Sequence, residues 1–228
     1  MADTDPTPQM PLSELTLDEL RPHLVAAMLV HVPFDGWTRK AAEAGAADLG
    51  LEPALAGLVF AGGPADMVDA YIARADVLMR TALDTDAYRA LKVREKVTVA
   101  IRTRLEQAAG DREAVRRATT LLAMPQHALR AARLSWRTAD SIWRLAGDTA
   151  TDFNHYSKRA LAAGVYGSTL LYWLHDDSEG FADSWAFLDR RIADVMRIEK
   201  AKARLKSGDE GAHLSPLRFL GRLRYPAA

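Results

Sequence analysis

The sequence predicts an all-α protein of about nine or ten helices, and three observations support this prediction. Alanine, leucine and arginine are abundant, runs of β-branched residues are scarce, and proline and glycine recur at intervals typical of helices joined by short connections. The chain has 228 residues, of which 49% are apolar, so it can bury a sizeable core. A globular helical protein is therefore expected.

The expected helices follow from the apolar periodicity and from the signals at their ends. They lie at about 12–31, 37–48, 53–60, 64–82, 86–109, 111–122, 125–146, 153–175 and 179–206, with a short last helix near 216–224. Four starts carry a proline at the first helical position, where its missing N–H costs nothing: Pro53, Pro64, Pro125 and Pro216. Asp152 and Ser178 are expected N-caps, since their side chains can accept hydrogen bonds from the first turn.

Composition narrows the cellular setting. The absence of cysteine removes disulfides and thiolate sites, so a reducing interior fits best. The start of the chain resembles neither a signal peptide nor a transit peptide, and its charge-free apolar stretches are shorter than the roughly 20 residues that span a bilayer. The net charge is +0, but residues 200–228 hold seven bases against two acids. We therefore expect a cytoplasmic protein whose C-terminal end favours an anionic surface.

Catalytic and metal-binding patterns are missing from the sequence. Its six histidines are scattered, and there is no HExxH pair, nucleophile elbow, phosphate-binding loop or dinucleotide fingerprint. His175, Asp176 and Asp177 are adjacent, so on a helix they would diverge rather than converge on a metal, and a solvated helix end is the simpler interpretation. For Asp140, Asp148 and Asp152 we expect capping or surface pairing. The prediction is a protein that is not an enzyme and that needs no metal or cofactor.

The N-terminal part resembles the three-helix unit of TetR-type regulators, in which a helix-turn-helix precedes a larger helical ligand-binding domain. The resemblance lies in the order helix, HVPFDGWT, helix, DLGLEP, short helix, FAGGPADMV. From Ala41 to Ala73, however, there is no Lys or Arg, and most nonspecific DNA affinity comes from basic side chains that release counterions. We therefore expect a degenerate helix-turn-helix without nucleic-acid binding. A TetR-type ligand-responsive transcription regulator is the alternative.

Three further segments resemble the coenzyme Q biosynthesis protein Coq-nine family. They are HVPFDGWTRKAAEAGAADLGLEPALAGLVFAGGPADMVD, IWRLAGDTATDFNHYSKRALAAGVYGSTLLYW and DDSEGFADSWAFLDRRI, and the similarity covers about residues 20–198. The resemblance implies a TetR-like fold that has lost DNA binding and a hydrophobic pocket that holds isoprenoid lipid. It also implies a non-catalytic accessory role in ubiquinone biosynthesis, in which quinone precursors are presented to a membrane-bound quinone hydroxylase.

The stretch 160–174, ALAAGVYGSTLLYWL, carries no charge and many small residues. Small residues either let another helix approach closely or leave volume unfilled, so the residues alone allow both an ordinary core and an apolar cavity. The family resemblance favours the cavity. The expected lipid-binding residues are Leu134, Trp136, Leu161, Val165, Leu170, Trp173, Trp185 and Leu188.

Two further surfaces are expected. The polar start of the same helix mixes donors, acceptors and an aromatic ring, as in a recognition patch. The expected partner-binding residues are Ile142, Trp143, Asp152, His155, Tyr156 and Arg159, and we expect charge reversal at Arg159 to leave the protein folded. The last segment places leucines and phenylalanine beside arginines, as in an interfacial membrane helix. The expected membrane-binding residues are Leu217, Arg218, Phe219, Leu220, Arg222 and Leu223, with docking of this helix on its own domain as the alternative.

These expectations divide the chain into four parts. They are a disordered segment at 1–11, the degenerate helix-turn-helix subdomain at 12–82, a helical lipid-binding domain at 83–206, and a linker with the C-terminal amphipathic helix at 207–228. The last two long helices could also pair two copies into a homodimer, because TetR-like folds often associate in this way. The protein is then expected at the inner face of a bacterial membrane, bound peripherally.

Overall fold

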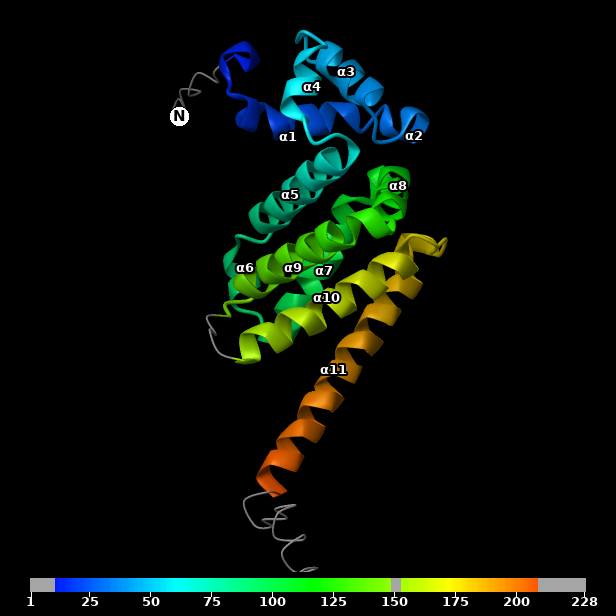
Figure 1. Cartoon of the computed structure of the whole chain (residues 1–228). Helices are drawn as coiled ribbons and strands as arrows, with labels where there is room; N and C mark the ends of the chain where they lie inside the picture. Colours follow the sequence, from blue (N-terminus) through cyan, green and yellow to red (C-terminus); the bar gives the residue numbers. More distant parts are fainter. Residues whose placement is uncertain (1–10, 149–152, 209–228) are drawn as a thin grey trace, which may run out of the picture. The chain divides into compact units, whose positions relative to one another are not determined.

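The computed structural model describes residues 11–148 and 153–208, and the side chains of residues 11–148 and 156–197. Within these ranges the chain forms eleven α-helices and four short 3-10 helices, and no strand occurs there. Figure 1 shows them as successive rods from α1 in blue to α11 in orange. The predicted all-α class is confirmed.

The first four helices form a small N-terminal unit: α1 (Leu17–Met28), α2 (Val32–Asp35), α3 (Arg39–Asp48) and α4 (Leu55–Val59). Helix α1 starts at a capping box, in which the Thr16 backbone N–H donates to Glu19 Oε2 at 2.9 Å and the Thr16 hydroxyl accepts from the Glu19 N–H. Helices α1 and α3 approach closely, since a Cβ added to Gly45 would lie 2.7 Å from the Met28 backbone nitrogen. Glycine is thus required at this contact.

The larger part of the bundle holds α5 (Pro64–Ala82), α6 (Asp86–Arg89), α7 (Val93–Gln107), α8 (Arg112–Leu122), α9 (Ala128–Leu145) and α10 (Phe153–Trp173). Helix α9 contacts α5, α7 and α10, and Figure 1 shows these long helices side by side. Trp37 of the N-terminal unit donates its indole N–H to the Ala114 carbonyl on α8 at 3.0 Å. Arg117 of α8 donates to the Pro33 carbonyl at 2.9 Å, so α8 fixes the N-terminal unit to the bundle.

The prediction of a single helix at 86–109 is wrong, because the helix is interrupted between α6 and α7. Lys92 is extended, with ψ 153°, and its backbone N–H is held by the Glu95 carboxylate at 3.0 Å. Tyr88 is buried, and its hydroxyl donates to the Lys96 carbonyl at 3.1 Å. This hydrogen bond fixes the position of α6 relative to the first turn of α7. Tertiary burial of one tyrosine thus overrides a favourable helical sequence.

Other expected boundaries shift by a few residues. The predicted helix at 12–31 divides into a 3-10 turn at Leu12–Glu14 and α1, the short α2 was not predicted, and α4 begins two residues after Pro53. Pro64 opens α5 as expected, and Pro125 opens a 3-10 turn that leads into α9. The last helix, α11 (Ala182–Gly208), follows a 3-10 turn at Glu179–Phe181. Asp152 and the helix near 216–224, with Pro216, lie outside the described residues.

The chain divides into two compact units, and the division falls between Leu188 and Asp189, inside α11. In the second unit Asp194 pairs with Arg191 at 2.8 Å and with Arg197 at 2.5 Å. Both are spaced as neighbours on one helical face, where such exposed pairs contribute a few tenths of a kcal/mol. The domain boundaries expected near residues 82 and 206 remain predictions.

An ion cluster joins α9 to α10. Arg159 of α10 is 2% exposed, and its Nε lies 2.6 Å from Asp140 Oδ1 and its Nη1 3.1 Å from Asp148 Oδ2. Lys158 adds a contact of 2.7 Å to Asp148. Asp140 and Asp148 are therefore paired, as expected, but Arg159 is buried rather than displayed. Charge reversal at Arg159 is thus no longer expected to leave the fold intact, because three carboxylates would then share a buried space.

The turn before α11 is organised by Asp176, which the sequence places in a solvated helix end but which is 5% exposed. Its Oδ1 accepts from the Ser178 N–H and hydroxyl at 2.9 and 2.6 Å, and its Oδ2 from the Ser184 N–H and hydroxyl at 2.8 and 2.5 Å. Burial alone would raise the pKa of Asp176, but these four hydrogen bonds together outweigh it and lower the pKa to about 2. Ser178 stands at the N-cap position of the 3-10 turn as predicted, but its side chain makes no cap hydrogen bond to that turn and instead accepts from the Asp183 N–H at 3.1 Å.

Replacing Arg159 by Met should lower the free energy of unfolding by about 3 kcal/mol, because Asp140 and Asp148 lose a buried partner. The matched control is Arg144→Met: Arg144 also pairs with Asp140, at 2.7 Å, but its side chain is 73% exposed. That variant should lose less than about 0.5 kcal/mol. Urea unfolding measures both, and equal losses would contradict the assigned burial.

Asp176→Asn should lower the free energy of unfolding by about 2 kcal/mol at pH 7, because an amide cannot accept four hydrogen bonds as the carboxylate does. The folded pKa of Asp176 lies below its ordinary value of 3.8, so the carboxylate stabilises the fold above about pH 4 and this contribution is lost as the pH falls toward 2. The variant should lose less stability over that interval than the parent. Asp177→Asn, at a side chain 96% exposed, is the control and should keep the parent's free energy of unfolding to within about 0.5 kcal/mol.

Candidate functional site

A pocket of about 370 Å³ lies among α5, α7, α8, α9 and α10, within the first compact unit. Most of its lining is aliphatic. The large apolar side chains of the wall are Ile72, Leu105, Val115, Leu122, Leu134, Leu170 and Leu171. A concave, mainly apolar space of this size is typical of a small-molecule site.

Helical spacing explains how the sequence builds the wall. On α9 the lining positions Ala131, Leu134, Ser135 and Thr138 recur every three to four residues, so they share one face. Gly167 of α10 also lines the pocket, and a Cβ added there would meet no atom within 4 Å. At Gly167 the small residues of the charge-free stretch therefore leave volume unfilled instead of admitting a neighbouring helix.

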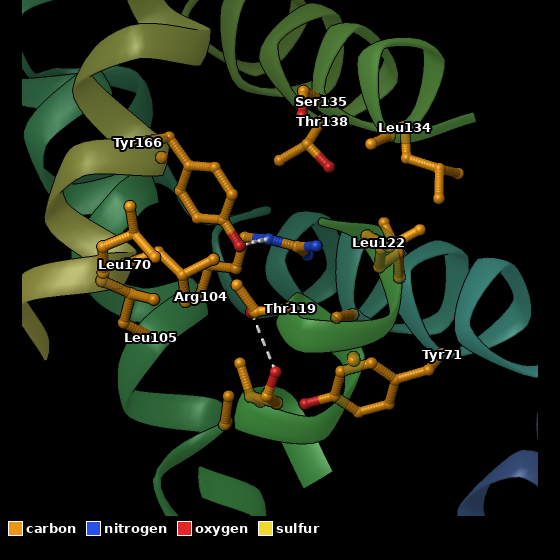
Figure 2. A pocket seen from close by; sticks show the side chains of 18 of the residues that line it. Tyr71, Arg104, Leu105, Thr119, Leu122, Leu134, Ser135, Thr138, Tyr166 and Leu170 are labelled. Atoms are coloured by element: carbon orange, nitrogen blue, oxygen red, sulfur yellow. Dashed lines mark hydrogen bonds between the residues drawn. The ribbon is translucent and has the colours of Figure 1, made fainter. Parts of the chain in front are cut away.

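One side of the pocket is polar and deeply buried (Figure 2). Arg104 is 4% exposed, its Nε donates to the Tyr166 hydroxyl at 3.0 Å, and its Nη1 lies 2.9 Å from Asp76 Oδ1. Thr138 donates its hydroxyl to the same carboxylate at 3.2 Å. Burial raises the pKa of Asp76, while Arg104 and Arg137 act in the opposite direction. The cluster supplies a cation and hydroxyl groups to an otherwise apolar lining, and Asp76, which lies outside the lining, balances the charge of Arg104.

Tyr71 of α5 brings a second phenol to this side of the pocket. Its ring lies 5.5 Å from the Trp37 ring, and Tyr71 is part of the pocket lining drawn in Figure 2. Burial raises the pKa of Tyr71 above its ordinary value, and Asp111 acts in the same direction. The phenol therefore stays protonated at neutral pH and can donate a hydrogen bond.

The open side of the pocket is identified by the lining residues that are exposed. Ala123 at the end of α8, Ser135 on α9 and Leu171 on α10 are all exposed, whereas Tyr71, Arg104 and Thr138 are buried. The polar groups at Tyr71, Arg104 and Thr138 thus lie away from solvent, and a ligand enters past Ala123, Ser135 and Leu171.

The expected lipid-binding residues occupy several environments. Leu134 and Leu170 line the pocket. Val165, Trp173 and Leu188 are buried outside its lining, and Leu161, Trp136 and Trp185 are partly exposed. Trp173 and Trp185 serve other contacts. The Arg112 guanidinium lies 5.5 Å from the Trp173 ring, and Trp185 donates to the Gly180 carbonyl at 2.8 Å.

The expected partner-binding residues do not form one exposed patch. Ile142 is fully buried and Arg159 lies in the ion cluster between α9 and α10. Trp143 donates to the Lys158 carbonyl at 2.8 Å, while Tyr156 is 61% exposed and its ring lies 5.9 Å from that of Trp136. Asp152 lies outside the described residues, as does the side chain of His155. The membrane-binding residues Leu217, Arg218, Phe219, Leu220, Arg222 and Leu223 also lie outside the described part.

The sequence did not single out Tyr71, Arg104 or Tyr166 as site residues. They come from three helices and are brought together only by packing. One signal was present: Arg104 follows Ile101 at the spacing of one helical face and precedes Leu105, so a charge stands at a core position. A charged residue at such a position is paired or functional more often than solvated.

The degenerate helix-turn-helix lacks a free cationic surface where the structure describes it. Arg39 and Lys40 at the start of α3 pair with Glu43 at 2.6 Å and with Asp35 at 2.7 Å. Helix α4 carries no base, and its Leu58 is 62% exposed. Among the described residues, no group of three or more metal-ligating side chains occurs and no helix is long and apolar enough to cross a bilayer.

Comparison with solved structures supports the fold. The TetR transcriptional regulator from Nitrosomonas europaea superposes with a TM-score of 0.62 and 19% identity, covering 77% of this chain and 97% of that one. At this identity the likeness concerns architecture. The predicted TetR-like fold is confirmed.

Comparison with protein families identifies relatives by sequence. The family model described as COQ9 matches residues 128–199. Proteins named "Ubiquinone biosynthesis protein COQ9, mitochondrial" match over 200 residues at 30% identity in Rattus norvegicus and 29% in Homo sapiens. Each alignment covers 85% of this chain, and 64% and 63% of the relatives' lengths, so the chain spans less than two thirds of these relatives. The resemblance to the coenzyme Q biosynthesis protein Coq-nine family is confirmed, and residues 128–199 are the part of this chain that matches the COQ9 family model.

Proposed function

We propose that this protein is a non-catalytic lipid-binding accessory protein of ubiquinone biosynthesis. It binds polyprenylated quinone precursors in the pocket among α5, α7, α8, α9 and α10 and presents them to a membrane-bound quinone hydroxylase. The observation that carries the proposal is the apolar pocket of about 370 Å³, which lies in a chain whose relatives are named for ubiquinone biosynthesis. Burial of isoprenoid carbon there substitutes for the apolar surroundings that a lipid leaves behind in the bilayer.

The lining supports binding rather than chemistry. Arg104, Tyr71 and Tyr166 are its ionisable members, and neither a histidine nor a carboxylate is part of it in the described chain. The catalytic step is therefore assigned to the partner enzyme, with this protein supplying the substrate. No cofactor or metal is needed for that role.

The partner and membrane contacts remain parts of the proposal. Tyr156 is the candidate anchor for the hydroxylase, since it is a large exposed aromatic residue and such side chains are frequent at interface centres. Residues 217–223 are the candidate membrane contact, at the inner face of a bacterial membrane. A homodimer formed by the last two long helices, and absence of nucleic-acid binding, complete the proposed set of interactions.

Gly167→Leu should reduce the lipid that copurifies with the protein by about tenfold, because the new side chain fills part of the pocket. The fold should persist, since a Cβ at this position has open space and leucine favours a helix over glycine by roughly 0.5–1 kcal/mol. The control is Gly164→Leu, one turn earlier on α10, where a Cβ also meets nothing within 4 Å but which does not line the pocket.

Native mass spectrometry followed by organic extraction measures the bound lipid. A parent protein that carries no isoprenoid lipid, and takes up none when it is offered, would remove the pocket from the proposed function. Equal loss in the two leucine variants would mean that the bound lipid lies elsewhere.

Tyr156→Ala should weaken capture of the quinone hydroxylase by at least about tenfold, while lipid content and thermal stability stay at the parent level. Tyr172→Ala is the control on the same helix, because Tyr172 is 38% exposed and its ring stacks on Phe187 at 4.6 Å. Copurification from detergent extracts and the cellular ubiquinone content provide the readouts. Normal capture and normal ubiquinone in the Tyr156 variant would exclude Tyr156 as the anchor.

A further inference from the structure

The pocket contains hydrogen-bond donors that the described part of the protein does not satisfy. Tyr166 accepts from Arg104 Nε at 3.0 Å, yet its own hydroxyl hydrogen has no acceptor among the described residues. The Tyr71 hydroxyl makes no hydrogen bond there either, although the residue is only 6% exposed. Two phenols that line the same cavity, with hydroxyl hydrogens that no described residue accepts, therefore favour a ligand that brings acceptor oxygens.

The charges around these phenols indicate what kind of oxygen is accepted. Arg104 is already balanced by Asp76, whose Oδ1 lies 2.9 Å from Arg104 Nη1. Arg137, which approaches the same carboxylate at 3.7 Å, pairs more closely with Asp69 at 2.6 Å. An entering carboxylate or phosphate would thus find no uncompensated cation and would stand near a buried anion. A neutral acceptor, such as a carbonyl or methoxy oxygen, meets no such penalty.

The size and the opening of the pocket indicate which end of the ligand enters. About 370 Å³ corresponds to roughly a dozen water molecules at about 30 Å³ each, enough for a substituted ring but not for a long polyprenyl tail. Tyr71 is buried and Tyr166 is half-buried, whereas the lining residues Ala123, Ser135 and Leu171 are exposed. A ring bound at the phenols therefore leaves its tail to pass out between these three residues.

We propose that the pocket binds the neutral, oxygen-bearing ring of its ligand innermost, with Tyr71 and Tyr166 donating hydrogen bonds to ring oxygens and the tail leading out past Leu171. This inference rests on the proposed function and specifies the orientation that the function leaves open. The Tyr71 side chain is held in place without a ligand, because its ring packs 5.5 Å from the Trp37 ring. The Trp37 indole N–H in turn donates to the Ala114 carbonyl. In this orientation the protein covers the ring that the hydroxylase must receive.

The test compares three probes on the whole protein. One is a dimethoxy-methyl-benzoquinone carrying one isoprene unit, the second is an isoprenoid hydrocarbon without oxygen, and the third is a fatty acid of similar length. Tyr71→Phe removes one hydroxyl and little else, whereas Tyr166→Phe also removes the acceptor of Arg104 Nε, so the hydrocarbon probe and thermal stability serve as its controls. The control is Tyr88→Phe, since Tyr88 is buried but donates to the Lys96 carbonyl outside the pocket.

We expect each of the two pocket variants to bind the quinone about five- to tenfold more weakly, as for loss of one hydrogen bond. Binding of the hydrocarbon should change by less than about twofold, and the control should bind both probes like the parent. Thermal stability of Tyr71→Phe should match or exceed that of the parent, because an unsatisfied donor is removed. This combination separates ligand recognition from a merely structural role.

The contrary outcomes distinguish an error in the ring-inward orientation from an error in the proposed function. If the parent binds quinone and hydrocarbon but both phenylalanine variants bind quinone equally well, the ring-inward orientation is wrong while the proposed function stands. Equal losses for quinone and hydrocarbon would also overturn it, because they would indicate altered packing. Tighter, tyrosine-dependent binding of the fatty acid would replace the neutral ring by an anionic head group. A parent protein that binds none of the probes would overturn both proposals.

Discussion

The ion pair between Arg104 and Asp76 is the constraint around which the bundle is organised. Both side chains are about 4% exposed, and between them they engage α5, α7, Thr138 of α9 and Tyr166 of α10. Removing two charges from water costs several kcal/mol each, so this pair is kept only where geometry and hydrogen bonds compensate. The helices must therefore hold one arrangement to satisfy it, and the same arrangement leaves the cavity beside it.

The N-terminal unit combines the helix order of a DNA-binding unit with paired basic side chains. Its helices have the order of a DNA-binding unit, and the structural likeness to a TetR regulator extends over most of the chain. The bases at the start of α3 are neutralised by neighbouring acids, and α4 has none. The N-terminal unit packs on α8 and is joined to it by the hydrogen bonds of Trp37 and Arg117. Architecture alone therefore does not identify the class of ligand.

Local signals predicted much of the fold and part of the site. Helical periodicity and Pro64 placed α5 at its observed bounds, and the small residues around Gly167 allowed a cavity, which the family resemblance favoured. The break at Lys92 was missed because it follows from burial of Tyr88, which no neighbouring residue reveals. Arg159 was taken for a surface residue because its two carboxylate partners lie on an earlier helix and its connection. The phenols of the pocket were missed for the same reason: 95 residues separate Tyr71 from Tyr166 (166 − 71), and sequence patterns report neighbours along one element.

The close approach of α1 and α3 at Gly45 has a consequence for reading variation among relatives. No side chain fits between this position and the Met28 backbone, so purifying selection would keep glycine there whatever the unit binds. An invariant glycine in the second helix of a helix-turn-helix is readily taken as a trace of operator recognition. Here it would record only the separation of two helix axes, and it would persist in lineages that never contact DNA.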